Sequence, residues 1–254
     1  MKIAMISSWH VHAKDYAKQI MELSQCEIIA VWDENKEAGI KWANKLNCKF
    51  IEDYDLLLKD DSIEGVVINS PTVMHTELII KAANAKKHIF TEKVLALTVD
   101  DCIKIKEAVE RNNVKFSIAF VHKFSSEMIF AKQMVESGAL GDITYARVRN
   151  AHNGSIANWL PESFYNKENC GGGAMIDLGT HTVYLLEWLL GKAKNVTATF
   201  TKITNRQVED NAVSVFEFQN GAIGVAETSF VSVYTPLTLE IKIGRASCRE
   251  RVYG

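Results

Sequence analysis

The sequence predicts an α/β protein: a doubly wound parallel sheet followed by an α+β part with a mostly antiparallel, open sheet. In the first half, short apolar runs alternate with amphipathic runs of helical period. Strand patterns dominate the second half, and Asn220-Gly221 between two of them is a strong hairpin signal. Short apolar strands joined by helices are typical of a parallel sheet with both faces covered. Such sheets bind ligands beyond the carboxyl ends of their strands.

The elements of the first half follow from hydrophobic period. Short apolar runs predict strands at Lys2–Ile6, Glu27–Trp32, Gly65–Ile68, His88–Phe90 and Lys115–Phe120. Apolar residues at three- and four-residue spacing predict helices at Lys14–Leu23, Lys36–Leu46, Thr76–Ala85 and Val99–Arg111.

The pattern changes at about Phe124. A helix is expected over Ser126–Ser137, because Gly138 follows it as a stop signal. Strands are expected at Ile143–Arg149, Val196–Thr201, Ala212–Phe218 and Ala222–Phe230.

Three glycines, Gly171 to Gly173, open a further expected helix that contains Asp177 and His181. Residues four apart lie on one helical face, so this acid and this histidine are expected side by side. A histidine beside a carboxylate can remove a proton from a hydroxyl near neutral pH. The alternative is a glycine turn followed by a core histidine.

Composition excludes several function classes. The 254 residues are 47% hydrophobic and 24% charged, with a net charge of −2 and no long basic run. Such a chain lacks the electrostatic footprint of nucleic-acid or anionic-membrane binding, so neither partner is expected. The five cysteines are scattered without a Cys-x-x-Cys pair, which argues against a disulfide framework and favours a cytoplasmic setting.

Up to Lys242, the chain resembles the Gfo/Idh/MocA family of nicotinamide-dependent sugar and cyclitol oxidoreductases. The resemblance rests on motifs in the family's order: Asp33, Ser70-Pro71-Thr72 with His75, Glu92-Lys93, Gly138 to Gly141, Gly171 to His181, and Asp210 with Asn220-Gly221. It implies a Rossmann domain over residues 1–122 and a substrate and oligomerisation domain over residues 123–242. Members usually continue further, so the second domain is expected to be incomplete. Residues 243–254 read like a translated sequencing adapter and are expected to be non-native.

The loop after the first strand departs from the family. Relatives place glycines there, because the backbone must approach a dinucleotide pyrophosphate at a helix N-terminus. Here the segment Ser7 to His12 contains none. The resemblance implies NAD as the cofactor, with Ser7, Trp9, His10 and His12 near it in an altered geometry. His10 and His12 could instead share a metal ion, but the sequence identifies no further ligand, and no metal is expected.

Asp33 follows the second strand and matches the acid that binds the adenosine ribose. A carboxylate there accepts from the ribose hydroxyls and repels a 2′-phosphate, which favours NAD over NADP. The resemblance also places Ser70, Pro71 and Thr72 near the cofactor. For His75 a ligand role and a packing role both remain open.

Glu92-Lys93-Val94 matches two residues of the family's Glu-Lys-Pro motif. The resemblance implies that Glu92 lies near the nicotinamide ribose and that Lys93 meets substrate and cofactor. The bond before the family's proline is often cis, and a cis bond before a non-proline residue costs about 2.5–4 kcal/mol. Val94 therefore predicts a trans bond and an altered direction for Lys93.

The expected reaction is the reversible oxidation of a secondary hydroxyl on a sugar, cyclitol or related polyol. The resemblance implies three catalytic residues, Lys93, Asp177 and His181, with His181 as the base and Lys93 polarising the oxygen. NAD-dependent glycoside cleavage and a non-catalytic dinucleotide-binding regulator are the alternatives. A homo-oligomer is expected. Trp159 and Tyr165 are expected as a wall for a sugar ring or as core residues.

Overall fold

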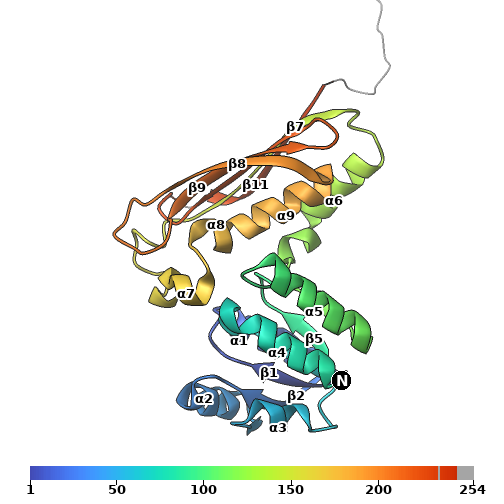
Figure 1. Ribbon diagram of the computed structural model, residues 1–254, viewed down its shortest axis with the longest axis vertical. Helices are drawn as coiled ribbons and strands as arrows, with labels where there is room; N and C mark the ends of the chain where they lie inside the picture. Colours follow the sequence, from blue (N-terminus) through green and yellow to red (C-terminus); the bar gives the residue numbers. More distant parts are fainter. Residues whose placement is uncertain (234, 245–254) are drawn as a thin grey trace, which may run out of the picture. The chain divides into compact units, whose positions relative to one another are not determined.

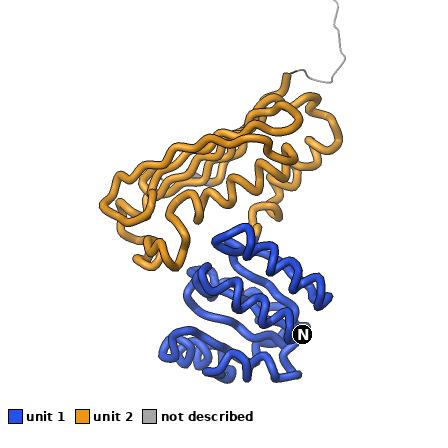
Figure 2. The backbone as a smooth tube through the Cα atoms, viewed as in Figure 1, with its two compact units in different colours: residues 1–119 blue, residues 120–254 orange. Residues whose placement is uncertain are grey.

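A computed structural model describes residues 1–233 and 235–244, and the chain divides into two compact units, Met1–Ala119 and Phe120–Gly254 (Figure 2). The proposed non-native tail falls almost wholly outside the described residues. Among the described residues, no helix has both the length and the apolar character that a membrane crossing needs.

The amino-terminal unit is built on a six-stranded parallel sheet of order β3-β2-β1-β4-β5-β6 (Figure 1). Its strands are β1 Lys2–Ile6, β2 Glu27–Trp32, β3 Lys49–Phe50, β4 Gly65–Ile68, β5 His88–Thr91 and β6 Phe116–Ile118. Its helices are α1 Ala13–Glu22, α2 Lys36–Leu46, α3 Tyr54–Leu58, α4 Thr72–Asn84 and α5 Val99–Asn112. The strand order reverses between β1 and β4, which is where parallel sheets of this kind bind ligands. The predicted fold class of this half is confirmed.

Both faces of this sheet are buried, as the apolar strands predict. On one face, Ile6 and Ile68 pack with Leu57 and Ile79 of the covering helices. The opposite face forms a second cluster that includes Met5, and this alternation along β1 follows from the two-residue period of a strand.

The carboxyl-terminal unit contains a five-stranded sheet of order β11-β7-β10-β9-β8. Its strands are β7 Ile143–Ala151, β8 Ala193–Thr201, β9 Asn211–Phe218, β10 Ile223–Ser229 and β11 Thr235–Ile243. Only β7 and β10 pair in parallel; the other pairs are antiparallel. The helices are α6 Ser126–Glu136, α7 Lys167–Cys170, α8 Ala174–Asp177 and α9 Gly179–Leu190, with short 3-10 turns at Val121–Phe124 and Glu162–Tyr165. The mostly antiparallel sheet is confirmed.

One face of the second sheet is covered and the other is open. Helix α9 lies along the covered face (Figure 1), where Leu185 and Leu186 pack with Phe218 and Ala146. Burial alternates along β9, since even-numbered residues from Ala212 to Phe218 are buried and odd-numbered ones are more exposed. The sheet therefore presents a polar-rich open face.

The single helix expected after Gly173 is wrong. The segment forms two helices, α8 ending at Asp177 and α9 beginning at Gly179, so Asp177 and His181 do not share one continuous helix. The interruption is one residue long, since Leu178 keeps helical dihedrals (φ −80°, ψ −36°), and the Thr180 hydroxyl donates across it to the carbonyl of Ile176 at 2.6 Å. The amide of His181 accordingly donates to the carbonyl of Leu178, three residues back.

Candidate functional site

The glycine-free loop after β1 keeps a left-handed turn. Ser7 has a φ of 66°, in the region that favours glycine, and its side chain is buried. Its hydroxyl accepts a hydrogen bond from the amide of Trp9 at 3.1 Å, and its amide donates to the carbonyl of Trp32 at 2.7 Å. Serine therefore supplies the turn that glycine supplies elsewhere, and its neighbours stabilise it.

The buried Asp33 carboxylate ties this loop to the carboxyl end of β2. Its Oδ2 accepts from the amide and the hydroxyl of Ser8 at 2.9 and 2.7 Å, and its Oδ1 accepts from the amide of Asn35 at 2.9 Å. A carboxylate has about four lone-pair sites, so three are engaged by protein and acceptor capacity remains.

Glu92, directly after β5, is the acid around which the loop histidines gather. His12 Nδ1 lies 2.9 Å and His10 Nδ1 3.3 Å from Glu92 Oε1, and the Tyr16 hydroxyl donates to the same oxygen. Burial alone raises the pKa of Glu92, but the His12 hydrogen bond and the charges of His10 and Lys93 outweigh it and bring the pKa to about 2. Burial and the Glu92 charge raise the pKa of Tyr16, so the phenol remains a donor. Glu92 is therefore an ionised, buried carboxylate.

His75 is buried between the carbonyls of two loops. Its Nδ1 lies 2.8 Å from the carbonyl of Val94 and its Nε2 3.1 Å from the carbonyl of Ser70. Burial lowers the pKa of this imidazole. Of the two roles left open for His75, these contacts support packing.

The Lys93–Val94 peptide bond is cis, so the expected trans bond is wrong. The trans bond was expected because residue 94 is valine and not proline. The segment is fixed on both sides, by the Val94 carbonyl at His75 and by the Lys93 amide, which donates to Glu92 Oε2 at 3.0 Å.

Two polar atoms after β4 remain unsatisfied within the part of the chain that the structure describes. Asn69 Oδ1 and Ser70 Oγ are buried without a hydrogen-bond partner. Pro71 and Thr72 follow at the start of α4, and both are buried. Because buried polar groups are normally paired, unpaired ones at the carboxyl end of a strand fit a site for a polar ligand.

In the second unit, His181 lies against a phenol and a second imidazole. Its Nδ1 is 2.9 Å from Tyr184 Oη, which also accepts from the amide of His122 at 3.3 Å. The ring of His122 meets the His181 ring edge-on, with centroids 4.6 Å apart. Burial raises the pKa of Tyr184, so its hydroxyl is neutral. Tyr184 was not predicted as a site residue, because it does not match the further acid that the family often has near this position.

Asp177 ends α8 and is half-buried. Its charge acts on His152, whose pKa is nevertheless lowered because burial outweighs that attraction. Lys93 belongs to the first unit, and Asp177 and His181 belong to the second.

Glu209 positions the turn before α8, and no sequence signal pointed to it. Its Oε1 accepts from the amides of Gly173 and Met175 at 3.0 and 3.1 Å, and its carbonyl accepts from Ala174 at 2.9 Å. A Cβ on Gly173 would lie 2.0 Å from the Glu209 carbonyl oxygen. The glycine is therefore required for space.

The two expected wall residues separate. Tyr165 is buried in a cluster with Phe230, and its hydroxyl lies 2.8 Å from Ser155 Oγ. Trp159 is 55% exposed and its ring lies against His152. Tyr165 is a core residue, and only Trp159 remains available to a ligand.

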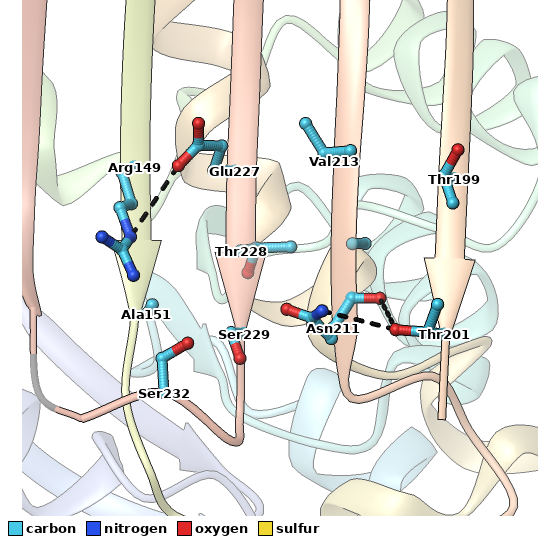
Figure 3. A pocket seen from close by; sticks show the side chains of 11 residues that line it. Arg149, Ala151, Thr199, Thr201, Asn211, Val213, Glu227, Thr228, Ser229 and Ser232 are labelled. Atoms are coloured by element: carbon cyan, nitrogen blue, oxygen red, sulfur yellow. Dashed lines mark hydrogen bonds and ion pairs between the residues drawn. The ribbon is translucent and has the colours of Figure 1, made fainter. Parts of the chain in front are cut away.

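A hollow of about 350 Å³ lies on the open face of the second sheet (Figure 3). Arg149, Glu227, Asn211 and Thr199 line it from four adjacent strands, and none of the residues expected in a catalytic or cofactor site is among its lining residues. The hollow lies on the face of the sheet opposite to α9, which carries His181.

Comparison with known proteins gives relatives that include sugar and inositol dehydrogenases. A scyllo-inositol 2-dehydrogenase (NAD(+)) of Bacillus subtilis is 28% identical over 232 residues, which cover 89% of this chain and 65% of that protein. A levoglucosan dehydrogenase of Pseudarthrobacter phenanthrenivorans is 29% identical over 206 residues, covering 70% of this chain and 52% of that protein. This chain thus spans less than two thirds of either relative's length.

A solved levoglucosan dehydrogenase in complex with NADH and levoglucosan superposes with a TM-score of 0.85 at 25% identity, over 96% of this chain and 71% of that one. Residues 1–120 match the oxidoreductase family model with an NAD-binding Rossmann fold, and residues 128–249 match a GFO/IDH/MocA C-terminal domain model. The chain therefore belongs to the Gfo/Idh/MocA oxidoreductase family, and its amino-terminal unit is an NAD-binding Rossmann domain.

Proposed function

We propose that the protein reversibly oxidises a secondary hydroxyl of a sugar, cyclitol or related polyol with NAD. The observation that carries the proposal is the pairing of His181 with Tyr184, which gives a buried imidazole a neutral hydrogen-bond partner. Relatives named as inositol and levoglucosan dehydrogenases support the substrate class.

NAD, when bound, supplies the hydride acceptor. The turn at Ser7 and the buried carboxylate of Asp33 fit such a group, and the remaining proposed contacts are Trp9, His10, His12, Ser70, Pro71, Thr72, Glu92 and Lys93. His75 acts on this set indirectly, through the carbonyls that it holds. Asp33 favours NAD over NADP, because a carboxylate repels a 2′-phosphate.

His181 is the proposed base. Tyr184 Oη already accepts from the His122 amide and has a second lone pair for a proton on His181 Nδ1. With Nδ1 protonated in this way, Nε2 carries the lone pair and can take the proton of a substrate hydroxyl. The proposal assigns the proton of this hydrogen bond to His181 Nδ1, and in that assignment Tyr184 is a positioning residue that favours the tautomer needed by the base.

Lys93 and Asp177 complete the proposed catalytic set. An ammonium beside the reacting oxygen stabilises the negative charge that develops when the proton leaves. Asp177 is proposed to orient His181 or to bind a neighbouring hydroxyl. Convergence of these two residues with His181 on one alcohol is part of the proposal.

The test is NAD reduction with a panel of sugars and cyclitols, for the parent and for His181→Ala. Activity is expected to fall roughly 100- to 10,000-fold in the variant, because that is the usual contribution of a general base. NADH binding, followed by its fluorescence, should be unchanged. His88→Ala is the matched control, since His88 lies at the amino end of β5 and should leave activity intact.

Three outcomes would redirect the proposal. Retained turnover in His181→Ala contradicts the assignment of the base. Cleavage of a chromogenic glycoside without net NADH would instead favour a glycosidase. Tight NADH binding without turnover of any polyol would favour a regulatory role.

A homo-oligomer formed through the open face of the second sheet is also proposed. The face carries exposed Val215 and Ile223 beside paired charges such as Arg147 and Glu227. Light scattering of the purified protein measures the assembly. A monomer at all concentrations would contradict it.

A further inference from the structure

Three side chains with metal-binding atoms meet in the amino-terminal unit. They are His10 and His12 from the β1–α1 loop and Glu92 after β5, hereafter the His-His-Glu cluster. One ligand atom from each lies within 4.8 Å of the other two. The sequence offered the two histidines without a third ligand, and the fold supplies Glu92.

The backbone around the cluster is fixed by hydrogen bonds. The amide of His10 donates to the carbonyl of Asn69 at 3.0 Å, which ties the loop to the end of β4. His12 directly precedes α1, and the amide of Lys93 holds Glu92 Oε2. The ligand atoms are therefore held near one another by two separate segments, the β1–α1 loop and the residues after β5, which reduces the cost of ordering them around an ion.

The separations fit a small tetrahedral ion. Ligands that lie about 2.0–2.1 Å from a tetrahedral zinc ion are roughly 3.3 Å from one another. The two imidazole nitrogens lie 3.3 and 2.9 Å from Glu92 Oε1. The third separation, between the ligand nitrogens of His10 and His12, is at most 4.8 Å, so coordination requires these two side chains to close on the ion.

The donor set selects the class of metal. Two imidazoles and one carboxylate form the ligand set of several zinc enzymes, in which water or substrate takes the fourth position. Imidazole also suits copper, nickel and iron, whereas calcium and magnesium prefer oxygen ligands. The set therefore points to a divalent transition metal.

Hydrogen bonding alone leaves Glu92 Oε1 crowded. His12 Nδ1 and the Tyr16 hydroxyl already fill the roughly two lone pairs of this oxygen, and His10 Nδ1, which accepts from the amide of His12 at 3.3 Å, lies 3.3 Å from it as a third polar atom. A cation that replaces imidazole protons draws the nitrogen lone pairs and the carboxylate toward one centre. His10 and Glu92 are buried, while the side chain of His12 is 43% exposed and gives an ion access from solvent.

We propose that His10, His12 and Glu92 bind one divalent transition-metal ion, with Zn²⁺ as the expected occupant and one coordination position left open. Binding replaces the proton on each imidazole nitrogen that joins the ion, so protons are released to solvent. The site goes beyond the proposed oxidation chemistry and does not require it. It lies in the loop that the proposed function assigns to the dinucleotide.

The experiment is calorimetric titration of the metal-free, full 254-residue protein with Zn²⁺, without dinucleotide. One ion per chain is expected to bind. His12→Gln and Glu92→Gln should each weaken binding by more than the roughly 10- to 100-fold that loss of an outer contact costs. His88→Ala, a histidine at the opposite end of β5, should bind as the parent does.

Glu92→Gln removes a buried charge and can impair folding, so His12→Gln at the surface is the decisive variant. Circular dichroism shows whether each variant remains folded. Cobalt(II) gives an independent readout, because a tetrahedral site with nitrogen and oxygen ligands gives intense visible bands without a thiolate charge-transfer band.

Three results overturn the proposal. One is the absence of Zn²⁺ binding at micromolar concentration. A second is parent-like affinity in His12→Gln. The third is a thiolate charge-transfer band with cobalt, which would place the ion on a cysteine instead.

Discussion

Two helix-preceding turns, one in each unit and each within ten residues of a candidate histidine, are built from opposite residue types. The β1–α1 loop, Ser7 to His12, contains no glycine, although Ser7 adopts a φ of 66°. The turn before α8 contains Gly171, Gly172 and Gly173, and a Cβ at Gly173 would lie 2.0 Å from the Glu209 carbonyl oxygen. In the first turn conformation favours glycine, whereas in the second turn space requires it.

The comparison shows that these two uses of glycine are not equally replaceable. A left-handed conformation costs an ordinary residue roughly 1–2 kcal/mol, which hydrogen bonds such as the one at the Ser7 hydroxyl can offset. A steric clash between an added Cβ and a neighbouring backbone atom can be relieved only if one of the two chain segments moves. The missing glycine motif after β1 therefore does not remove the turn.

Gly173→Ala is expected to have the largest effect. The added methyl collides with the Glu209 carbonyl and should lower the free energy of unfolding by roughly 3 kcal/mol, at the upper end for overpacking. Urea unfolding measures the change. Gly138→Ala is the matched control, because Gly138 has a φ of 71° and open space around it, and should lose only about 1–2 kcal/mol. If both substitutions lowered the free energy of unfolding equally, the proposed difference between a glycine required for space and a glycine favoured by its φ would be contradicted.

Tyr184→Phe examines the histidine that follows the glycine-rich turn. Without the phenol, His181 Nδ1 loses its partner and the base-competent tautomer is no longer favoured, so kcat should fall roughly 10- to 100-fold with KM little changed. Steady-state kinetics measures the split. Tyr165→Phe, which also removes a buried hydroxyl contact in this unit, should leave kcat unchanged. An equal loss in both variants would indicate general destabilisation.

Glu209→Ala tests how the second turn is held. The amides of Gly173 and Met175 lose their shared acceptor, and the expected loss is about 1 kcal/mol in the free energy of unfolding. Glu217→Ala removes an exposed ion pair in the same unit and should cost less than about 0.5 kcal/mol. A negligible loss at Glu209 would show that its carbonyl alone fixes the turn.

Ser7→Gly is expected to have the smallest effect and the opposite sign. Glycine adopts a positive φ without steric cost, so the substitution should raise the free energy of unfolding by about 0.5–1 kcal/mol. Two effects reduce this gain: the loss of the hydrogen bond from the Trp9 amide and the greater conformational entropy of the unfolded chain. Thermal unfolding measures the gain. Ser137→Gly, at a φ of −70°, should be neutral or destabilising. Stabilisation by both substitutions would mean that φ is not the cause.

The sequence predicted the parallel sheet and most of its helices because their hydrophobic period is long and regular. It missed β3, which has two residues, and α3, which has five, because such short elements show no clear hydrophobic period. The break at Leu178 was missed because it is one residue long and keeps helical dihedrals, so no residue pattern marks it.

The sequence predicted most residues of the candidate site from their types, but it did not predict which of these side chains contact one another. Glu92 and the loop histidines are about 80 positions apart in sequence, and only the order of strands in the sheet brings them together. Tyr184 and Glu209 were invisible because their roles depend on which atoms they face.

The most direct test of the account follows the hydrogen that leaves the substrate. A polyol deuterated at the carbon that bears the reacting hydroxyl is incubated with the protein and NAD, and the reduced cofactor is analysed by mass spectrometry. One deuterium in NADH, absent with His181→Ala, is the predicted result. A protein that binds NADH yet transfers no deuterium from any sugar or cyclitol would contradict the account.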